Sequence, residues 1–142
     1  MVFFLSLLSS LILFIVSIFH VYWAFGGHFG VESVIPKKLT EDENRMPPAI
    51  LTLIVAMVFF AMGILFLDKL NRFDFSFIPE FLKSYGIISM GVIFLIRAIG
   101  EFNYVGFFKK IKNTKFGIND TKYYSPLCLF LAISAFIIEF TQ

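Results

Sequence analysis

The sequence contains few charged residues and a single cysteine. The first shortage argues against an ordinary soluble domain, and the second excludes disulfide-stabilised folds and multi-thiolate metal sites. Charged side chains make up 15% of the 142 residues, against roughly 25% in ordinary soluble domains. The net charge of +2 is too small to indicate a nucleic-acid partner. Cys128 alone cannot form an internal disulfide or a multi-thiolate metal site.

Motifs for catalysis and cofactor binding are also missing. The chain has no phosphate-binding glycine loop, no zinc motif and no nucleophile elbow. We therefore predict no metal ion and no cofactor. The first apolar stretch has no Lys or Arg before it and no small-x-small cleavage site after it, so we expect a retained span rather than a secretory signal.

Apolar residues dominate the sequence, at 58%, and gather in four long stretches. A helix needs about 20 residues to cross the hydrocarbon of a bilayer. Each crossing segment must be helical, because lipid offers the backbone no hydrogen-bond partner. The sequence therefore predicts a single all-α domain over residues 1–142, an integral membrane four-helix bundle. Its spans are expected at about 2–24, 49–67, 81–104 and 124–140.

The distribution of Lys and Arg predicts an orientation in a cell membrane. Loop one (26–46) and loop three (105–123) share one side and hold eight of the 12 Lys and Arg, including Lys37, Lys38 and Arg45. Under the positive-inside rule these loops are expected to be cytoplasmic, with both termini outside. Lysines 109, 110 and 112 follow an aromatic pair, and we interpret them as snorkelling side chains at the interface.

One pair of opposite charges lies near the end of the third predicted span. Arg97 and Glu101 are four residues apart, so they would share a helix face. A charge in a membrane helix costs about 2.5–3.5 kcal/mol even on the lenient insertion scale, which favours an inward-facing pair. Three interpretations remain open: a structural clamp between helices, a ligand site, or snorkelling at the interface.

The first predicted span carries a polar stripe at helical spacing, formed by Ser6, Ser10, Ser17 and His20. A polar stripe in a membrane helix is expected to face other helices. For His20 we consider an interhelical hydrogen bond, a ligand contact and a proton-handling role. Metal or haem ligation is least favoured, because the other histidine, His28, lies in a loop.

The expected topology brings polar and aromatic residues to the membrane side of loops one and three. Such a group at the mouth of a bundle is a default binding-site hypothesis. The rival interpretation is that helix ends are polar in any membrane protein. The candidate ligand-binding residues are His20, Trp23, Arg97, Glu101, Tyr104, Asp120, Tyr124 and Ser125.

Several short motifs resemble those of a known family. They are HVYWAFGG at 20–27, Pro36, RAIGEF at 97–102, VGFF at 105–108, Asp120-Thr121 and YSPLC at 124–128. The chain resembles, over nearly its whole length, a family of small bacterial four-span membrane proteins catalogued as a domain of unknown function. The resemblance implies a multi-pass cell-membrane protein and brings no established activity or catalytic residue.

Three functions fit these observations, and in each the lipid bilayer is the first partner. The protein could bind or transport a small amphiphile or lipid in a pocket at the mouth, with Arg97 and Glu101 fixing the polar end and Trp23 lining it. It could be an enzyme acting on a lipid-soluble substrate with His20 or Glu101 as acid or base. It could be a structural or regulatory subunit whose small-residue helix faces pack against a second copy or another membrane protein.

Overall fold

The computed structural model describes residues 1–36, 47–72 and 74–141. Within these ranges it contains helices and connecting loops, and no strand. The loop-one charges at Lys37, Lys38 and Arg45, which entered the orientation argument, lie outside the described residues.

Four helical segments of the described chain are long and apolar enough to cross a membrane. They are α1 (Val2–Ala24), α3 (Ala49–Asp68), α4 (Glu80–Ile99) and the continuous segment Lys115–Thr141. This last segment joins α5 (Lys115–Asn119), a π-helical turn η1 (Asp120–Tyr124) and α6 (Ser125–Thr141). A short helix, α2 (Val31–Val34), lies in loop one. The all-α membrane four-helix bundle predicted from the sequence is thereby confirmed.

The predicted end of the third span was wrong. This span ends at Ile99 and does not reach Tyr104, because Gly100 adopts φ 90°, a backbone conformation that glycine tolerates and that leaves the helix. In the fourth segment α6 begins at Ser125, close to the expected start at Tyr124, but the continuous helix already begins at Lys115. Loop three therefore runs from Gly100 to Thr114 in the structure, and it folds back over the end of α4.

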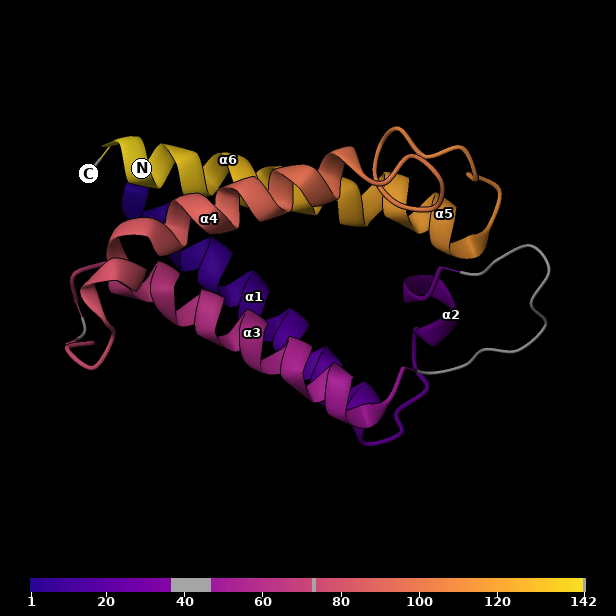
Figure 1. Cartoon of the computed structure of the whole chain (residues 1–142), viewed down its shortest axis with the longest axis horizontal. Helices are drawn as coiled ribbons and strands as arrows, with labels where there is room; N and C mark the ends of the chain where they lie inside the picture. The colour runs from indigo at the N-terminus through magenta and orange to yellow at the C-terminus, as the bar shows by residue number, and fades with distance from the viewer. Residues whose placement is uncertain (37–46, 73, 142) are drawn as a thin grey trace.

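The helices form two antiparallel hairpins, α1 with α3 and α4 with α6 (Figure 1). Small side chains allow α1 and α3 to approach closely. The Ser17 hydroxyl donates to the carbonyl oxygen of Ala56 at 2.8 Å, and the ring of Phe14 lies over Gly63. The predicted polar stripe of the first helix therefore contacts α3 at Ser17. There α3 provides the hydroxyl of Ser17 with a hydrogen-bond acceptor, which lipid chains lack.

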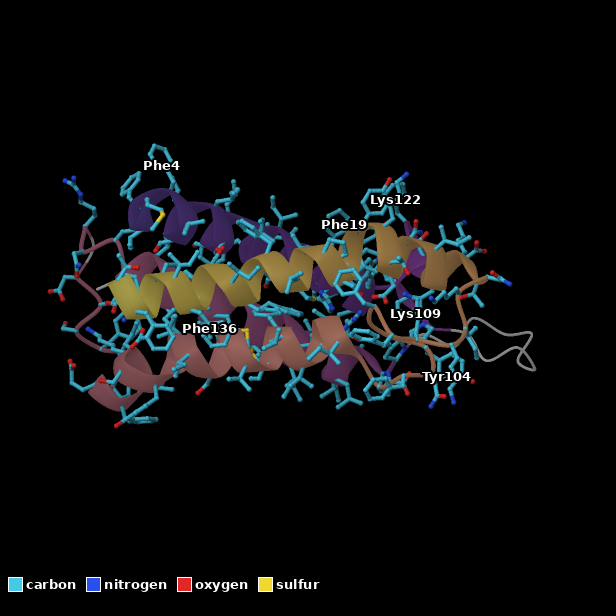
Figure 2. The ribbon with its side chains drawn as sticks, turned by 90° about the horizontal axis from the view of Figure 1, so that it is seen from above. Phe4, Phe19, Tyr104, Lys109, Lys122 and Phe136 are labelled. Atoms are coloured by element: carbon cyan, nitrogen blue, oxygen red, sulfur yellow. The ribbon has the colours of Figure 1, made fainter. Side chains whose placement is uncertain are left out.

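The second hairpin is packed by the same means. Gly91 of α4 faces Ala135 and Phe136 of α6, and Phe136 lies between these helices in Figure 2. Many large apolar side chains point outward: Phe4, for example, projects from the bundle and is 74% exposed (Figure 2). One of the predicted functions used the small residues of α3 and α6 as a surface for a partner protein. Ala56, Gly63 and Ala135 of that set contact other helices of this chain.

The hydrophobic core lies where the two hairpins meet. The hairpins diverge toward the end that carries loops one and three (Figure 1). The core residues come from the middle of α1, the end of α3, the middle and second half of α4, and the middle and second half of α6: Leu13, Phe66, Ile87, Met90, Phe94, Leu131, Ala132, Ala135 and Ile138.

Polar contacts connect the hairpins at both ends. Lys69, at the end of α3, forms an ion pair with Glu139 of α6 at 3.1 Å. At the opposite end α2 contacts α5, and Lys115 forms an ion pair with Glu32 at 2.9 Å. This second pair is largely exposed, so it contributes at most about 1 kcal/mol. The diverging ends of the hairpins are therefore held together only weakly by this ion pair.

Candidate functional site

Asp120 is completely buried in the fourth span and is surrounded by four donors. Its Oδ1 atom accepts a hydrogen bond from Nη2 of Arg97 at 2.8 Å. Its Oδ2 atom accepts from the backbone N–H of Gly106 at 2.8 Å, from Nζ of Lys109 at 3.0 Å and from the hydroxyl of Ser125 at 3.1 Å. A carboxylate can be ionised in such surroundings because it is paired and fully hydrogen-bonded.

Lys109 is also buried, and all three of its N–H donors are used. Besides Asp120, they reach the carbonyl oxygen of Gly106 at 3.0 Å and the hydroxyl of Thr121 at 2.6 Å. The Thr121 hydroxyl in turn donates to the carbonyl oxygen of Gly117 at 3.1 Å. An ammonium group has three donors and no acceptor, so this environment satisfies it completely. The Asp120 cluster comprises these hydrogen-bonded residues: Arg97, Gly106, Lys109, Asp120, Thr121 and Ser125.

Two glycines fold loop three back onto the end of α4. Gly100 and Gly106 have φ of 90° and 88°. A Cβ atom at Gly100 would collide with the carbonyl oxygen of Val105, and one at Gly106 would collide with Gly100 itself. The reversal lets the N–H of Phe107 bond the free carbonyl of Ala98 at 2.8 Å. It also directs the N–H of Gly106 and the side chain of Lys109 at Asp120.

The π-helical turn η1 brings Ser125 to the same carboxylate. In an α-helix, residues five apart lie roughly 140° apart around the axis. In η1 the N–H of Ser125 bonds the carbonyl of Asp120, which is the i→i+5 pattern of a π-helix. The wider turn lets the two side chains meet, and the Ser125 hydroxyl donates to Asp120 at 3.1 Å. Single π-turns inside α-helices are frequent at functional sites.

Arg97 differs from the other charged residues of the cluster because its guanidinium is only partly used. Nη2 pairs with Asp120, whereas Nη1 is buried and has no hydrogen-bond partner among the described residues. The side chain is 33% exposed, while those of Lys109 and Asp120 are fully buried. Arg97 is thus the one member of this ionic trio whose side chain is partly exposed, although its Nη1 atom is itself buried.

The predicted pair of Arg97 with Glu101 was wrong. Because α4 ends at Ile99, Glu101 is not on the helix that carries Arg97. The Glu101 side chain is exposed and accepts hydrogen bonds from Nδ2 of Asn103 at 3.3 Å and from the backbone N–H of Tyr104. The counter-ion of Arg97 is Asp120, 23 positions further along the chain.

His20 and Trp23 belong to the other hairpin. The Nδ1 atom of His20 lies 2.8 Å from the carbonyl oxygen of Val16 and donates to it, since a carbonyl oxygen can only accept. The ring packs against Trp23 and against Phe59 of α3. Nε1 of Trp23 donates to the carbonyl of Phe29 at 2.8 Å. The hydrogen bonds and ring contacts of both residues lie within α1, α3 and loop one, not with the Asp120 cluster.

The eight predicted site residues therefore fall into three groups. Three of them, Arg97, Asp120 and Ser125, are joined in the cluster, and Tyr124 is half-buried beside it with its ring against Phe116. Glu101 and Tyr104 lie in the reversed part of loop three, where Figure 2 shows Tyr104 at the edge of the fold. His20 and Trp23 form the third group, on α1.

Lys109 is the member of the site whose role the sequence analysis missed. It was interpreted as a snorkelling lysine, but it is 1% exposed and lies inside the fold of loop three (Figure 2). Nothing in its immediate sequence separates it from Lys110 and Lys112. Its partners Gly106 and Thr121 did stand in motifs noted above, VGFF and Asp120-Thr121, without a role.

A separate apolar hollow of about 470 Å³ lies on the surface of α1 and loop one. Ile18, Phe19, Tyr22 and Phe29 line it, and none of them carries a charge. In the described residues no group of three or more His, Cys, Asp or Glu is placed to hold a metal ion. The distinctive polar feature of this membrane end is therefore the Asp120 cluster.

The four spans define a multi-pass membrane protein, and its buried ion cluster lies within the second hairpin. The family model described as protein of unknown function (DUF3995) matches residues 13–135. The chain therefore belongs to this family, in agreement with the resemblance drawn from the motifs. Neither the curated proteins nor the solved structures gave a match to the chain.

Proposed function

We propose that this protein binds or transports a small amphiphile or lipid at the end formed by loops one and three, with that end facing the cytoplasm. The observation that supports this most is the partly used guanidinium of Arg97. Its Nη1 atom is buried at the edge of the ion cluster and has no hydrogen-bond partner among the residues that the structure describes. A buried donor without an acceptor costs about 1–3 kcal/mol, and more when charged, so binding a polar head there would recover free energy.

The arrangement of the hairpins supports access from the bilayer. Leu5 and Ile12 of α1 pack against the core, and Trp23 lies within roughly 20° of the same direction around the helix axis. The face of α1 that meets the second hairpin near the termini thus continues to Trp23, where the hairpins have diverged (Figure 1). In this proposal the apolar chain of the ligand packs along this face of α1 and its polar head lies at Arg97.

The two other functions receive less support. An enzyme using His20 and Glu101 would need both at one cavity, but their hydrogen bonds lie in different hairpins. Asp120 already accepts four hydrogen bonds, which suits a structural carboxylate better than a general base. The hypothesis of a structural or regulatory subunit was based on faces of small residues that could pack against a partner. One of these residues, Ala56 of α3, is instead in contact with α1 of the same chain, where it accepts a hydrogen bond.

Thermal unfolding of the detergent-purified protein with a panel of lipids and amphiphiles tests the proposal. At least one compound should stabilise the wild type, because a ligand that binds only the folded state raises its stability by about 2.7 kcal/mol at 100 times its Kd. Arg97→Ala should lose this shift. Lys110→Ala, which removes an exposed charge from the same loop, should keep it.

The comparison requires that Arg97→Ala elutes as the wild type does on gel filtration and retains its helical circular dichroism. If every compound shifts the wild type and Arg97→Ala equally, or if none shifts either, the proposed site is wrong.

A further inference from the structure

The Asp120 cluster carries more positive than negative charge. It contains the guanidinium of Arg97 and the ammonium of Lys109, but one carboxylate, that of Asp120. The nearby carboxylate of Glu101 is exposed and is engaged within loop three. An unbalanced charge at the edge of a low-dielectric region attracts a counter-ion strongly.

The excess charge is accessible at one residue. Lys109 is fully buried, and each of its N–H groups has an acceptor. The Arg97 side chain is 33% exposed, and its buried Nη1 atom has no hydrogen-bond partner among the described residues. The unsatisfied positive charge of the cluster therefore lies at Arg97, and a ligand that enters beside the exposed part of this side chain would complete the hydrogen bonds of Nη1.

The shape of a guanidinium selects among anions. Its planar N–H groups match two oxygens of a carboxylate or phosphate, whereas an ammonium acts as a point charge. A neutral head would leave the charge of the cluster unbalanced, and a cationic head would be repelled. A zwitterionic head would bring its own positive charge to the same place.

We infer that the polar head bound at Arg97 is an oxyanion, a phosphate or carboxylate group carried by an amphiphile with net negative charge. This rests on the proposed function and specifies its ligand class. Asp120 and Lys109 act as positioning residues: the carboxylate holds Nη2 of Arg97 at 2.8 Å and Lys109 secures the carboxylate. The ligand then takes the remaining donors of the guanidinium.

Native mass spectrometry of the detergent-purified full chain tests this inference with two phospholipids of identical acyl chains, phosphatidylglycerol and phosphatidylcholine. The wild type should retain phosphatidylglycerol about tenfold more tightly, as expected for one charge-assisted hydrogen bond. Arg97→Lys keeps the charge and one donor for Asp120 but loses the planar pair, so it should lose most of this preference. Lys110→Gln should keep the preference within about twofold, since its charge is exposed and screened.

The outcomes separate the two proposals. Equal retention of both lipids by the wild type overturns the oxyanion inference and leaves amphiphile binding in place, whereas retention of neither lipid overturns both. Equal loss of preference in Lys110→Gln and Arg97→Lys also overturns the inference, because it indicates general attraction to the lysines of loop three. Millimolar inorganic phosphate should not displace phosphatidylglycerol, and displacement would overturn the assignment of the anion to an amphiphile.

Discussion

Replacing Asp120 with asparagine keeps the size of the side chain and removes the negative charge of the Asp120 cluster. Two cations would then lie close together, and the ammonium of Lys109 would remain fully buried without a counter-ion. Removing one partner of a buried ion pair costs about 3–5 kcal/mol. Lys109→Met leaves the carboxylate with three donors, those of Arg97, Gly106 and Ser125, so its cost should be smaller, about 1–3 kcal/mol.

The double variant gives the more stringent test. Asp120→Asn combined with Lys109→Met removes both fully buried charges, so its cost should fall below the sum of the single costs by about 0.5–3 kcal/mol. Unfolding in mixed micelles of mild detergent and dodecyl sulfate, followed by far-ultraviolet circular dichroism, measures all four proteins. Glu101→Gln, at an exposed carboxylate of the same loop, should change stability by no more than about 0.5 kcal/mol. Additive single costs, or a cost below about 1 kcal/mol for Asp120→Asn, would refute the description of a coupled buried cluster.

Two further predictions use matched pairs in the same unfolding assay. The buried hydroxyl of Ser10 has no hydrogen-bond partner within residues 1–36, 47–72 and 74–141, so Ser10→Ala should raise the unfolding free energy by up to about 1 kcal/mol. Ser17→Ala, which loses its bond to α3, should lower it by about 0.6 kcal/mol. Shifts of the same sign would contradict this. Gly26 and Gly106 have nearly equal positive φ, but a Cβ at Gly26 meets open space and one at Gly106 meets backbone. Gly26→Ala should therefore cost about 1 kcal/mol and Gly106→Ala roughly 3 kcal/mol or more, and equal costs would show that loop three does not hold the reversed conformation.

The spans could be predicted from the sequence because the bilayer fixes the length and composition of a crossing helix. The pairing of Arg97 could not be predicted in this way. The i,i+4 spacing from Arg97 to Glu101 predicts a contact only if α4 continues through both residues. The helix ends before Glu101, because Gly100 leaves the helical conformation. A glycine at this point is a common helix terminator, so the sequence did contain a hint that the spacing argument should stop there.

Asp120 and Ser125 were both among the predicted site residues, and their direct contact depends on the π-turn between them. A π-turn has no strong sequence signature, and the α-helical spacing of these residues indicates different faces. Lys109 was missed for another reason. Its burial depends on the reversal of loop three, which is set by backbone angles at Gly100 and Gly106 that composition does not reveal.

All residues of the Asp120 cluster lie within one contiguous stretch, 97–125, which belongs entirely to the second hairpin. None of its hydrogen bonds involves α1 or α3. The ion pairs can consequently form within the second hairpin alone, without contacts from α1 or α3. The second hairpin thus carries its own means of shielding the ionised groups that it brings into the membrane, independent of when the first hairpin docks.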